Sequence, residues 1–461
     1  MEILIFTFFL VFLFLAIKRL DLATAFIIVF LPSYLIRFTV LSIPFTLLEL
    51  MILTTFVVWF FKKGPKIKEL IKKRKNKINY PFYVEIILIL IFASLSVFVA
   101  NFSIASLGIL KAYFIEPILF FILVINLFNK DKGRSKIFIS LTFLTLIVSL
   151  LAIYQKITGQ FIPNEFWAQA ETRRVISWFE YPNAVGLLLA PISVLLLGYF
   201  HYLPKRTDLK NSLKKIFILI TIFLSFLSIY FAKSEGALIA LLLSLVIFYF
   251  FYNKKCRKII LAFLLILVLS LIIYKPIGNY VFDKLSFKDL SGQIRLQQWS
   301  ETMQTLKGNS FYLGNGLSSY QEAVKPYHQE GIFYNFDKIE NFDAVVWANK
   351  DLHQKYWQPV EIYLYPHNIF LNFWTELGLF GMLIFSFLIL RFLLISLKLY
   401  FKQRKENKKN QYILLSLFSA MLVVLIHGLV DVPYFKNDLS ILFFLILAVL
   451  STFIIEQKNN I

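Results

Sequence analysis

The sequence predicts an all-α polytopic membrane protein with roughly 13 (12–14) transmembrane helices and one large polar connection. Of the 461 residues, 59% are hydrophobic and only 16% are charged, an apolar share well beyond that of soluble domains. Apolar runs close to the ~20 residues needed to cross a bilayer recur along the whole chain. The runs lack the alternation of a membrane barrel, and backbone groups in lipid must bond internally, so helices are expected.

Polar breaks between the apolar runs place the helices in order. The first, from 3 to 17, lacks a basic region before it and a cleavage site of small residues, so it is expected to be retained and not to be a signal peptide. The other helices are expected near 22–36, 44–61, 82–99, 109–128, 137–155, 183–203, 216–232, 236–252, 259–275, 364–390, 411–429 and 439–455.

Basic residues in the short connections predict the orientation. The formal net charge of +21 is spread over short clusters between apolar runs, which is a topology signal and not the single basic face of a nucleic-acid-binding protein. With the helices above, the basic connections all fall on one side, which the positive-inside rule makes cytoplasmic; they are Lys62 to Lys77, Lys130 to Lys136, Lys205 to Lys215, Lys254 to Lys258 and Arg391 to Lys409. The N-terminus is then expected outside and the C-terminus in the cytoplasm.

The longest connection on the predicted outer side suggests three regions. Residues 1–275 hold the first transmembrane helices with an outer loop at 156–182, residues 276–363 form the large extracytoplasmic loop, and residues 364–461 hold the last helices. The large loop is rich in Tyr, Trp, Phe and Gly, which argues against disorder, and short helices are expected in it, for example near 293–306. The single cysteine, Cys256, excludes disulfide frameworks and Cys-x2-Cys metal or redox sites.

The large loop and its return to the membrane carry the first candidate residues. His367 is expected at the outer boundary, where a histidine can take a proton from a hydroxyl as a general base, although a lone histidine there is more often a capping or interfacial residue. Arg295, four residues before Trp299, suits a phosphate ligand but can also be a solvated surface arginine. Gly314 and Gly316 permit a tight turn or a close approach to a ligand.

Further candidates lie in the other outer connections. Arg173 and Arg174 put cations on the outer side, which is normally poor in basic residues. They are therefore expected to bind an anionic partner, either lipid headgroups or a diphosphate. Ionisable residues near helix ends in a membrane are functional candidates by default, although several can snorkel to the interface. In this chain they are Glu235, Glu376, His427 and Asp431.

The order of these motifs resembles the O-antigen ligase and O-antigen polymerase superfamily. The resemblance rests on Arg295-x3-Trp299, Gly314-x-Gly316, His367-Asn368-x2-Leu371 and Glu376-x-Gly378-x2-Gly381 within and after one large loop. Arg174 followed by Tyr181-Pro-Asn-Ala184, and the late acidic residue Asp431, extend it to roughly residues 140–450. Each motif alone is weak, whereas the order together with the topology is fairly specific.

The resemblance implies a GT-C-like fold in the cytoplasmic membrane and a metal-independent, cofactor-free glycosyltransferase. The donor would be an undecaprenyl-diphosphate-linked glycan and the acceptor a glycan or glycolipid, with membrane lipids as surroundings and no nucleic acid as a partner. His367 would be the base, Arg295 a catalytic and diphosphate-binding residue, and Arg173 and Arg174 diphosphate ligands; Asn368, Glu376, His427, Asp431, Gly314 and Gly316 would support them. The family often has Ser-Arg-Gly where this chain has Ser234-Glu235-Gly236.

The candidate residues are also compatible with other functional classes of membrane protein. A polysaccharide flippase or secondary transporter shares the helix number and the intramembrane ionisable groups, but transporters bind near the midplane through paired repeats, whereas the candidates here gather on one face. A membrane protein whose loop only binds a partner is a second rival. Polymerase, ligase and protein-glycosylating variants need the same donor-side chemistry, so the sequence does not separate them.

Overall fold

The computed structural model describes residues 2–40, 43–73, 80–204 and 208–459. Parts of two basic connections used for the topology prediction, residues 74–77 and 205–207, lie outside them. Over the described residues, nine helices are long and apolar enough to cross a membrane, and three shorter apolar helices accompany them, so this is a multi-pass membrane protein. The number of 13 spans is not confirmed.

The N-terminal part departs most from the predicted helices. α1 (Glu2–Lys18) is followed by α2 (Leu20–Val29) and a 3₁₀ turn, η1 (Leu31–Leu35), where Pro32 stands at the start. Strand β1 (Arg37–Val40) then pairs antiparallel with β2 (Ile43–Thr46). The helices expected at 22–36 and 44–61 are therefore shorter at this junction, because proline and β-branched residues favour a turn and a hairpin.

Five spans follow. α3 (Leu47–Lys73) and α4 (Tyr83–Val99) lead to one continuous helical run made of α5 (Ile104–Ile109), the π-helical η2 (Leu110–Ile115) and α6 (Glu116–Leu127). α7 (Asp131–Thr158) ends at Gly159, whose φ of +74° suits a glycine C-cap. The short α8 (Glu165–Ala168) precedes α9 (Asn183–Tyr202), α10 (Leu209–Phe231) and α11 (Glu235–Tyr252).

Two helices then leave the bundle: one of the nine spans and, directly after it, the first helix of the large polar connection. α12 (Lys254–Ile273) turns into α13 (Lys275–Leu285), and α14 (Leu290–Thr305) follows it. α14 confirms the helix expected near 293–306. The rest of the connection comprises α15 (Asn309–Leu313), α16 (Tyr320–Val324), η3 (Lys325–Tyr327), β3 (Gly331–Phe333), α17 (Phe342–Ala348), α18 (Lys350–Tyr356) and β4 (Trp357–Pro359), with β3 and β4 antiparallel.

The last three helices are α19 (Ile369–Lys405), α20 (Asn410–His427) and α21 (Asn437–Asn459). α19 is broken at Gly378, whose φ of +78° and ψ of 175° are not helical. The break is forced by close packing, because a Cβ on Gly378 would collide with the carbonyl oxygen of Tyr312 on α15. Glycine is therefore required where the connection passes over the helix.

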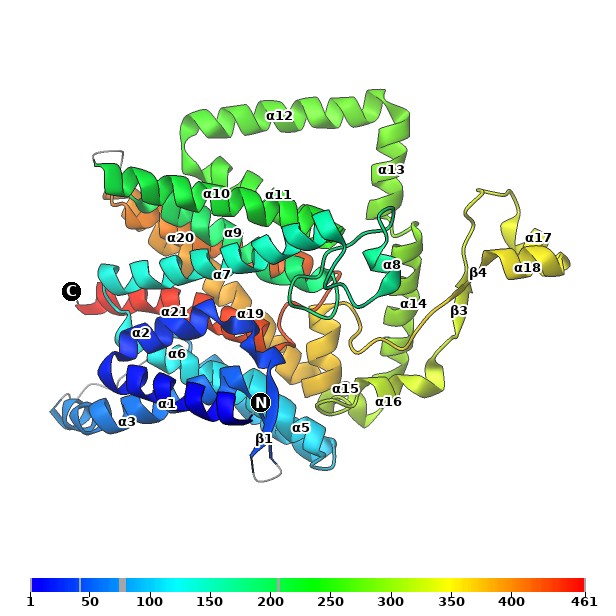
Figure 1. The fold of residues 1–461 in the computed structure, drawn as a ribbon. Coiled ribbons are helices and arrows are strands. Elements are labelled where there is room, and N and C mark those ends of the chain that lie inside the picture. Colours follow the sequence, from blue (N-terminus) through cyan, green and yellow to red (C-terminus); the bar gives the residue numbers. More distant parts are fainter. Residues whose placement is uncertain (1, 41–42, 74–79, 205–207, 460–461) are drawn as a thin grey trace.

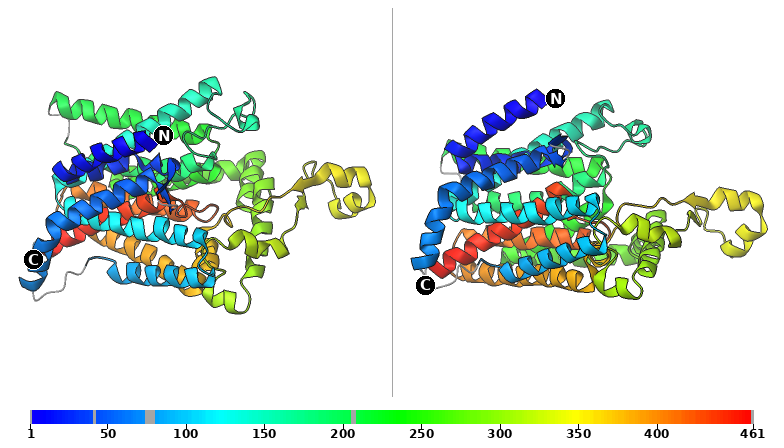
Figure 2. Two further views of the ribbon diagram at one scale, coloured as in Figure 1. Left: turned by 60° about the horizontal axis from the view of Figure 1, so that its bottom comes forward. Right: turned by 90° about the horizontal axis from the view of Figure 1, so that it is seen from below.

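The long helices lie side by side, with α9 and α20 packed together near the centre and α8 and α13–α18 gathered at one end of the bundle (Figure 1). We call this the loop end. Figure 2 shows from two further sides that β3, β4, α17 and α18 project from the loop end, while α21 finishes at the opposite end. The connections after α6, α11 and α19 also lie opposite the loop end (Figure 1).

Candidate active site

His367 lies at the loop end, two residues before α19 begins. Its φ is +44°, a left-handed conformation that is costly for a residue with a side chain. Asn368 next to it caps α19, because its Oδ1 accepts hydrogen bonds from the backbone N–H groups of Phe370 at 3.0 Å and Leu371 at 3.1 Å. The strained turn and the cap together fix the point at which the imidazole leaves the chain.

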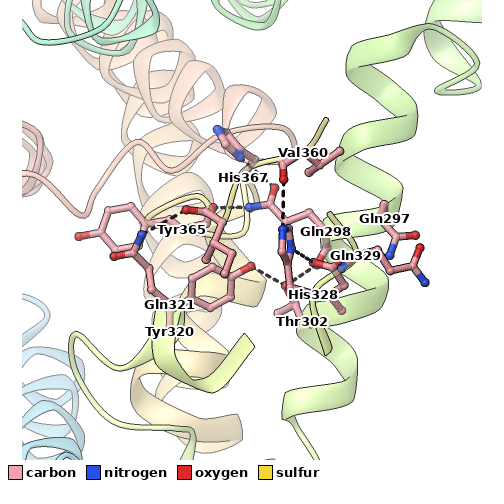
Figure 3. Close-up of polar contacts among 12 residues, drawn as sticks. Gln297, Gln298, Thr302, Tyr320, Gln321, His328, Gln329, Val360, Tyr365 and His367 are labelled. Carbon is pink, nitrogen blue, oxygen red and sulfur yellow. Dashed lines mark hydrogen bonds and ion pairs between the residues drawn. The ribbon is translucent and has the colours of Figure 1, made fainter. Parts of the chain in front are cut away.

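Gln298 of α14 fixes the orientation and the tautomer of that imidazole (Figure 3). The Nδ1 atom of His367 lies 2.9 Å from the Oε1 atom of Gln298, and the amide nitrogen of Gln298 donates to the carbonyl oxygen of Tyr365 at 2.7 Å. An amide oxygen only accepts, so Nδ1 carries the proton and Nε2 keeps its lone pair. The Gln298 side chain is buried, with 4% of its surface exposed.

One face of α14 holds the turn that contains His367. Arg295, Gln298, Trp299 and Thr302 are spaced so that they share this face. The indole N–H of Trp299 donates to the carbonyl oxygen of Pro366 at 2.8 Å, one residue beyond the carbonyl that Gln298 binds. The Arg-x3-Trp spacing thus positions the histidine turn with its tryptophan and leaves its arginine free for another contact.

That contact is with residues 428–436, the connection between α20 and α21, which we call the site loop. The Nε of Arg295 donates to the carbonyl oxygen of Val430 at 3.1 Å. The side-chain amide of Asn368 donates to the carbonyl of Leu429 at 3.2 Å, and the N–H of Ile369 donates to the carbonyl of Gly428 at 2.7 Å. Three successive carbonyls of the site loop therefore hold Arg295 and the residues after His367 together.

Arg174 is connected to the site loop by two successive side-chain hydrogen bonds. Its Nη2 donates to Oδ1 of Asn183 at 3.2 Å, and Nδ2 of Asn183 donates to Oδ2 of Asp431 at 3.1 Å. The same Asp431 oxygen lies 3.8 Å from Nε2 of His427. Arg174 also donates to the carbonyl of Ala232 at 3.0 Å, next to the start of α11. The structure thus brings together the predicted residues Arg174, His427 and Asp431.

Arg173 points elsewhere. Its guanidinium donates to the carbonyl oxygens of Lys156 and Ala168, both at 3.0 Å. Lys156 belongs to the last turn of α7, whose carbonyls carry partial negative charge. Arg173 therefore fastens α8 and its loop to the end of α7, and its part in binding a diphosphate stays a prediction.

Gly314, Gly316 and Glu376 form a second contact area, around the break in α19. A Cβ on Gly314 would lie 2.6 Å from the carbonyl oxygen of Thr375, and a Cβ on Gly316 would lie 2.7 Å from the backbone nitrogen of Ala100. The fully buried Glu376 accepts a hydrogen bond at 2.7 Å from the N–H of Ser318. The close approach that these glycines allow is to the protein's own backbone.

Electrostatics keep the imidazole of His367 neutral. Burial lowers the pKa of His367 below its usual range, Asp431 opposes this shift, and Arg295 adds to it. The residue is therefore uncharged at neutral pH and can accept a proton at Nε2. Burial also lowers the pKa of Arg174, with Glu235 opposing, but an arginine stays charged at neutral pH.

Two lysines that sequence reasoning did not single out also lie at the loop end. Lys284 of α13 is bound by Glu235 at 2.7 Å and by Asp289 at 2.8 Å, so a lysine distant in sequence stands beside the glutamate that departs from the family pattern. Lys436 is buried in the site loop, 3.3 Å from Asp438 and with its ammonium 4.0 Å from the ring centre of Phe179. In the sequence, only their charge could have indicated a role for these two residues, and charge does not distinguish them from the many other lysines of the chain.

Comparison with known families identifies part of this chain. Residues 220–386 match the family model described as O-antigen ligase. The resemblance predicted from the motifs is confirmed over this segment, and no curated protein matches the chain. The matched O-antigen ligase segment runs from α10 to the middle of α19, so it contains the α14 face, His367, Asn368, Glu376 and both loop glycines.

The other half of the polar cluster lies outside the O-antigen ligase segment. Arg174 and Asn183 precede it, whereas His427 and Asp431 follow it. They reach the matched residues through the site loop and through the bonds of Arg174 to the carbonyls before α11. The fold therefore brings residues from both flanks to the candidate site in the matched segment.

Proposed function

We propose that the protein transfers or polymerises a glycan on the outer face of the cytoplasmic membrane. The donor is an undecaprenyl-diphosphate-linked glycan, and the acceptor is a hydroxyl of another glycan or glycolipid. The matched O-antigen ligase family supports membrane glycan ligation or polymerisation as the kind of reaction. The observation that carries the proposal is the neutral His367, whose Nδ1 is bound by Gln298 while Nε2 keeps its lone pair.

In the proposed reaction, Nε2 of His367 removes the proton of the acceptor hydroxyl as its oxygen attacks the anomeric carbon of the donor sugar. The bond between that carbon and the diphosphate oxygen breaks, and the electron pair leaves with the diphosphate. Arg295, and Arg174 across the site loop, stabilise the charge that develops on the leaving group. The imidazolium then returns its proton to solvent. No metal or other cofactor takes part in the proposed step.

A reconstituted assay tests this proposal. Purified protein in liposomes is given lipid-linked oligosaccharide, and release of carrier diphosphate is measured for the wild type, His367→Ala and Arg295→Ala at matched folded amounts. Loss of the base is expected to slow the reaction by about 10²–10⁴-fold. Full activity of His367→Ala would overturn the site assignment. An inert wild type that moves intact lipid-linked glycan between leaflets would favour the flippase alternative.

A further inference from the structure

A second histidine of the large connection has both ring nitrogens close to acceptors (Figure 3). The Nδ1 atom of His328 lies 3.3 Å from Oε2 of Glu301 on α14, and its Nε2 atom lies 3.1 Å from the carbonyl oxygen of Val360. The other carboxylate oxygen of Glu301 accepts from the backbone N–H of Gln329 and from the side-chain amide of Gln297, both at 2.9 Å. We call Glu301, His328 and Val360 the clasp.

The contacts of the ring in the clasp favour the doubly protonated imidazole. An ionised carboxylate and a carbonyl oxygen only accept hydrogen bonds, whereas a neutral imidazole has a single N–H. One of its nitrogens would therefore face an acceptor with no proton between them, while the imidazolium donates to both. The side chains are largely buried, with 12% of His328 and 3% of Glu301 exposed, so an unsatisfied contact here is costly.

The charges around the ring also favour the second proton. Among the described residues, the charged group in contact with the ring is Glu301. Lys325, in the turn before the histidine, is paired with Glu322 at 2.5 Å. Two further carboxylates flank the clasp in sequence, Glu330 and Glu361. The ring is therefore surrounded mainly by negative charge, which stabilises an imidazolium.

The clasp is connected to the candidate site through residues 360–366, which we call the return segment. Val360 directly follows β4 and begins this segment, and His367 directly follows its end. The end of the return segment is held by the two α14 side chains described above. Between the two ends, the ring of Tyr363 lies 4.8 Å from the ring of His367, measured between centres. The clasp thus holds the beginning of the segment that leads into the proposed base.

We infer that the clasp positions His367 for the reaction, and that it does so only while His328 carries its second proton. The inference rests on the proposed function, in which His367 is the base, and it adds a positioning histidine that acts in the opposite protonation state. Because the closed clasp binds a proton, it weakens as the pH rises and the proton leaves. The reaction then has an acid limit set by His367 and an alkaline limit set by the clasp.

Glu301→Gln tests the clasp because it removes the need for the second proton. The new amide donates to Nδ1 of a neutral imidazole, whose Nε2–H still donates to Val360, and the amide oxygen still accepts from Gln329. The full-length protein in liposomes is assayed with lipid-linked oligosaccharide from pH 7 to 9. The wild type is expected to lose about tenfold in kcat toward pH 9, with little change in KM, whereas Glu301→Gln loses this pH dependence.

Glu322→Gln is the matched control for this variant. It makes the same chemical change in the same connection, but Glu322 is 74% exposed and lies outside the clasp, so the alkaline limb should remain as in the wild type. A wild type with no alkaline limb, or an unchanged limb in Glu301→Gln, would overturn the inference. A residue that only supports the local structure would lower activity at every pH and would not be rescued at pH 9 by an uncharged amide.

Hydrogen exchange gives a readout that needs no turnover. The backbone N–H of Gln329 donates to Glu301, and that of Val360 donates to the carbonyl of Glu330, both at 2.9 Å. At pH 9, peptides with these two amides are expected to exchange about tenfold faster in the wild type than in Glu301→Gln, while at pH 7 the two proteins match. Comparison at one pH cancels the intrinsic pH dependence of exchange. Equal exchange at both pH values would contradict the clasp.

The two readouts separate this inference from the proposed function. If exchange shows the expected pH dependence and the wild type transfers no glycan, the clasp opens as inferred and the proposed reaction is wrong. If transfer proceeds with the same kcat at pH 7 and 9 although exchange shows that the clasp opens, the reaction stands and the positioning role is wrong.

Discussion

The smallest arrangement on which the proposed chemistry depends is the contact between one amide and one imidazole. Gln298 accepts from Nδ1 of His367 at 2.9 Å and is itself fixed by its 2.7 Å bond to the carbonyl of Tyr365. A neutral acceptor selects the tautomer without favouring the charged form of the imidazole. A carboxylate at the same position would also select the tautomer but would favour imidazolium.

Gln298→Glu is therefore expected to raise the pKa of His367. The base works in its neutral form, so activity falls as the pH drops through this pKa, which in the wild type lies below the usual histidine value of about 6.5. In Gln298→Glu the acid limb of the pH–rate profile should move up by about one pH unit. The readout is kcat/KM from pH 4.5 to 8.5, together with diethyl pyrocarbonate modification of His367 followed by mass spectrometry.

Gln298→Leu serves as the control for this variant. It removes the acceptor without adding charge, so it should lower kcat and leave the acid limb within a few tenths of a pH unit. If Gln298→Glu and Gln298→Leu give the same profile, the residue only supports the local structure. The chemical modification measures the pKa even when turnover is absent, so the result does not depend on the proposed reaction.

Trp299 provides a second test at this scale. Trp299→Phe keeps a ring against Phe287, which lies 5.3 Å away between ring centres, but loses the 2.8 Å bond to the carbonyl of Pro366. Of the two bonds from α14 to the turn before His367, only that of Gln298 then remains, and kcat should fall about tenfold with little change in KM. An unchanged kcat would show that the second bond is not needed to place the imidazole.

At the scale of the elements, the break in α19 joins the large connection to the membrane helices. Gly378 has a φ of +78° and lies against the backbone of Tyr312 and Leu313. Gly378→Ala is expected to cost about 1–3 kcal/mol and to lower the midpoint of thermal unfolding in detergent. Gly108→Ala is the matched control, because a Cβ there meets nothing within 4 Å and should be neutral or slightly stabilising. Equal midpoints for the two variants would contradict this account.

The elements also show what the sequence could predict. Apolar runs located most long helices, because hydropathy is local information, and α14 was also expected within a few residues. The hairpin of β1 and β2, the break at Gly378 and the position of α12 depend on neighbours distant in sequence. Arg134 illustrates the same limit: it was counted with a basic connection, yet its side chain is 1% exposed and bound to Glu456 at 2.8 Å.

The candidate site was predictable to a similar degree. Motif order identified His367, Arg295, Arg174 and Asp431, and the structure places all four around the site loop. Gln298 was missed because a glutamine inside a helix carries no chemical signal until its partner is known. Lys284 was missed because its proximity to Glu235 arises only from the return of α13 to the bundle.

At the scale of the whole molecule, the arrangement separates the two ends of the bundle chemically. The candidate site occupies the loop end, while the basic connections after α6, α11 and α19 lie at the opposite end (Figure 1). The positive-inside rule then predicts that the loop end faces away from the cytoplasm. Single cysteines test this in intact cells, after the native thiol is removed by Cys256→Ser. Glu340→Cys reports on the loop end and Lys132→Cys, in the first turn of α7, on the opposite end, since both positions are exposed.

A membrane-impermeant maleimide added to intact cells should label Glu340→Cys and spare Lys132→Cys until the membrane is permeabilised. The reason is electrostatic, because translocating the basic connections would carry many uncompensated positive charges across the membrane. The reverse pattern would place the candidate site in the cytoplasm. Glycan transfer on the outer face would then be impossible, even if His367 were still required for activity in detergent. Orientation and chemistry therefore constrain the proposed function independently, and each can fail without the other.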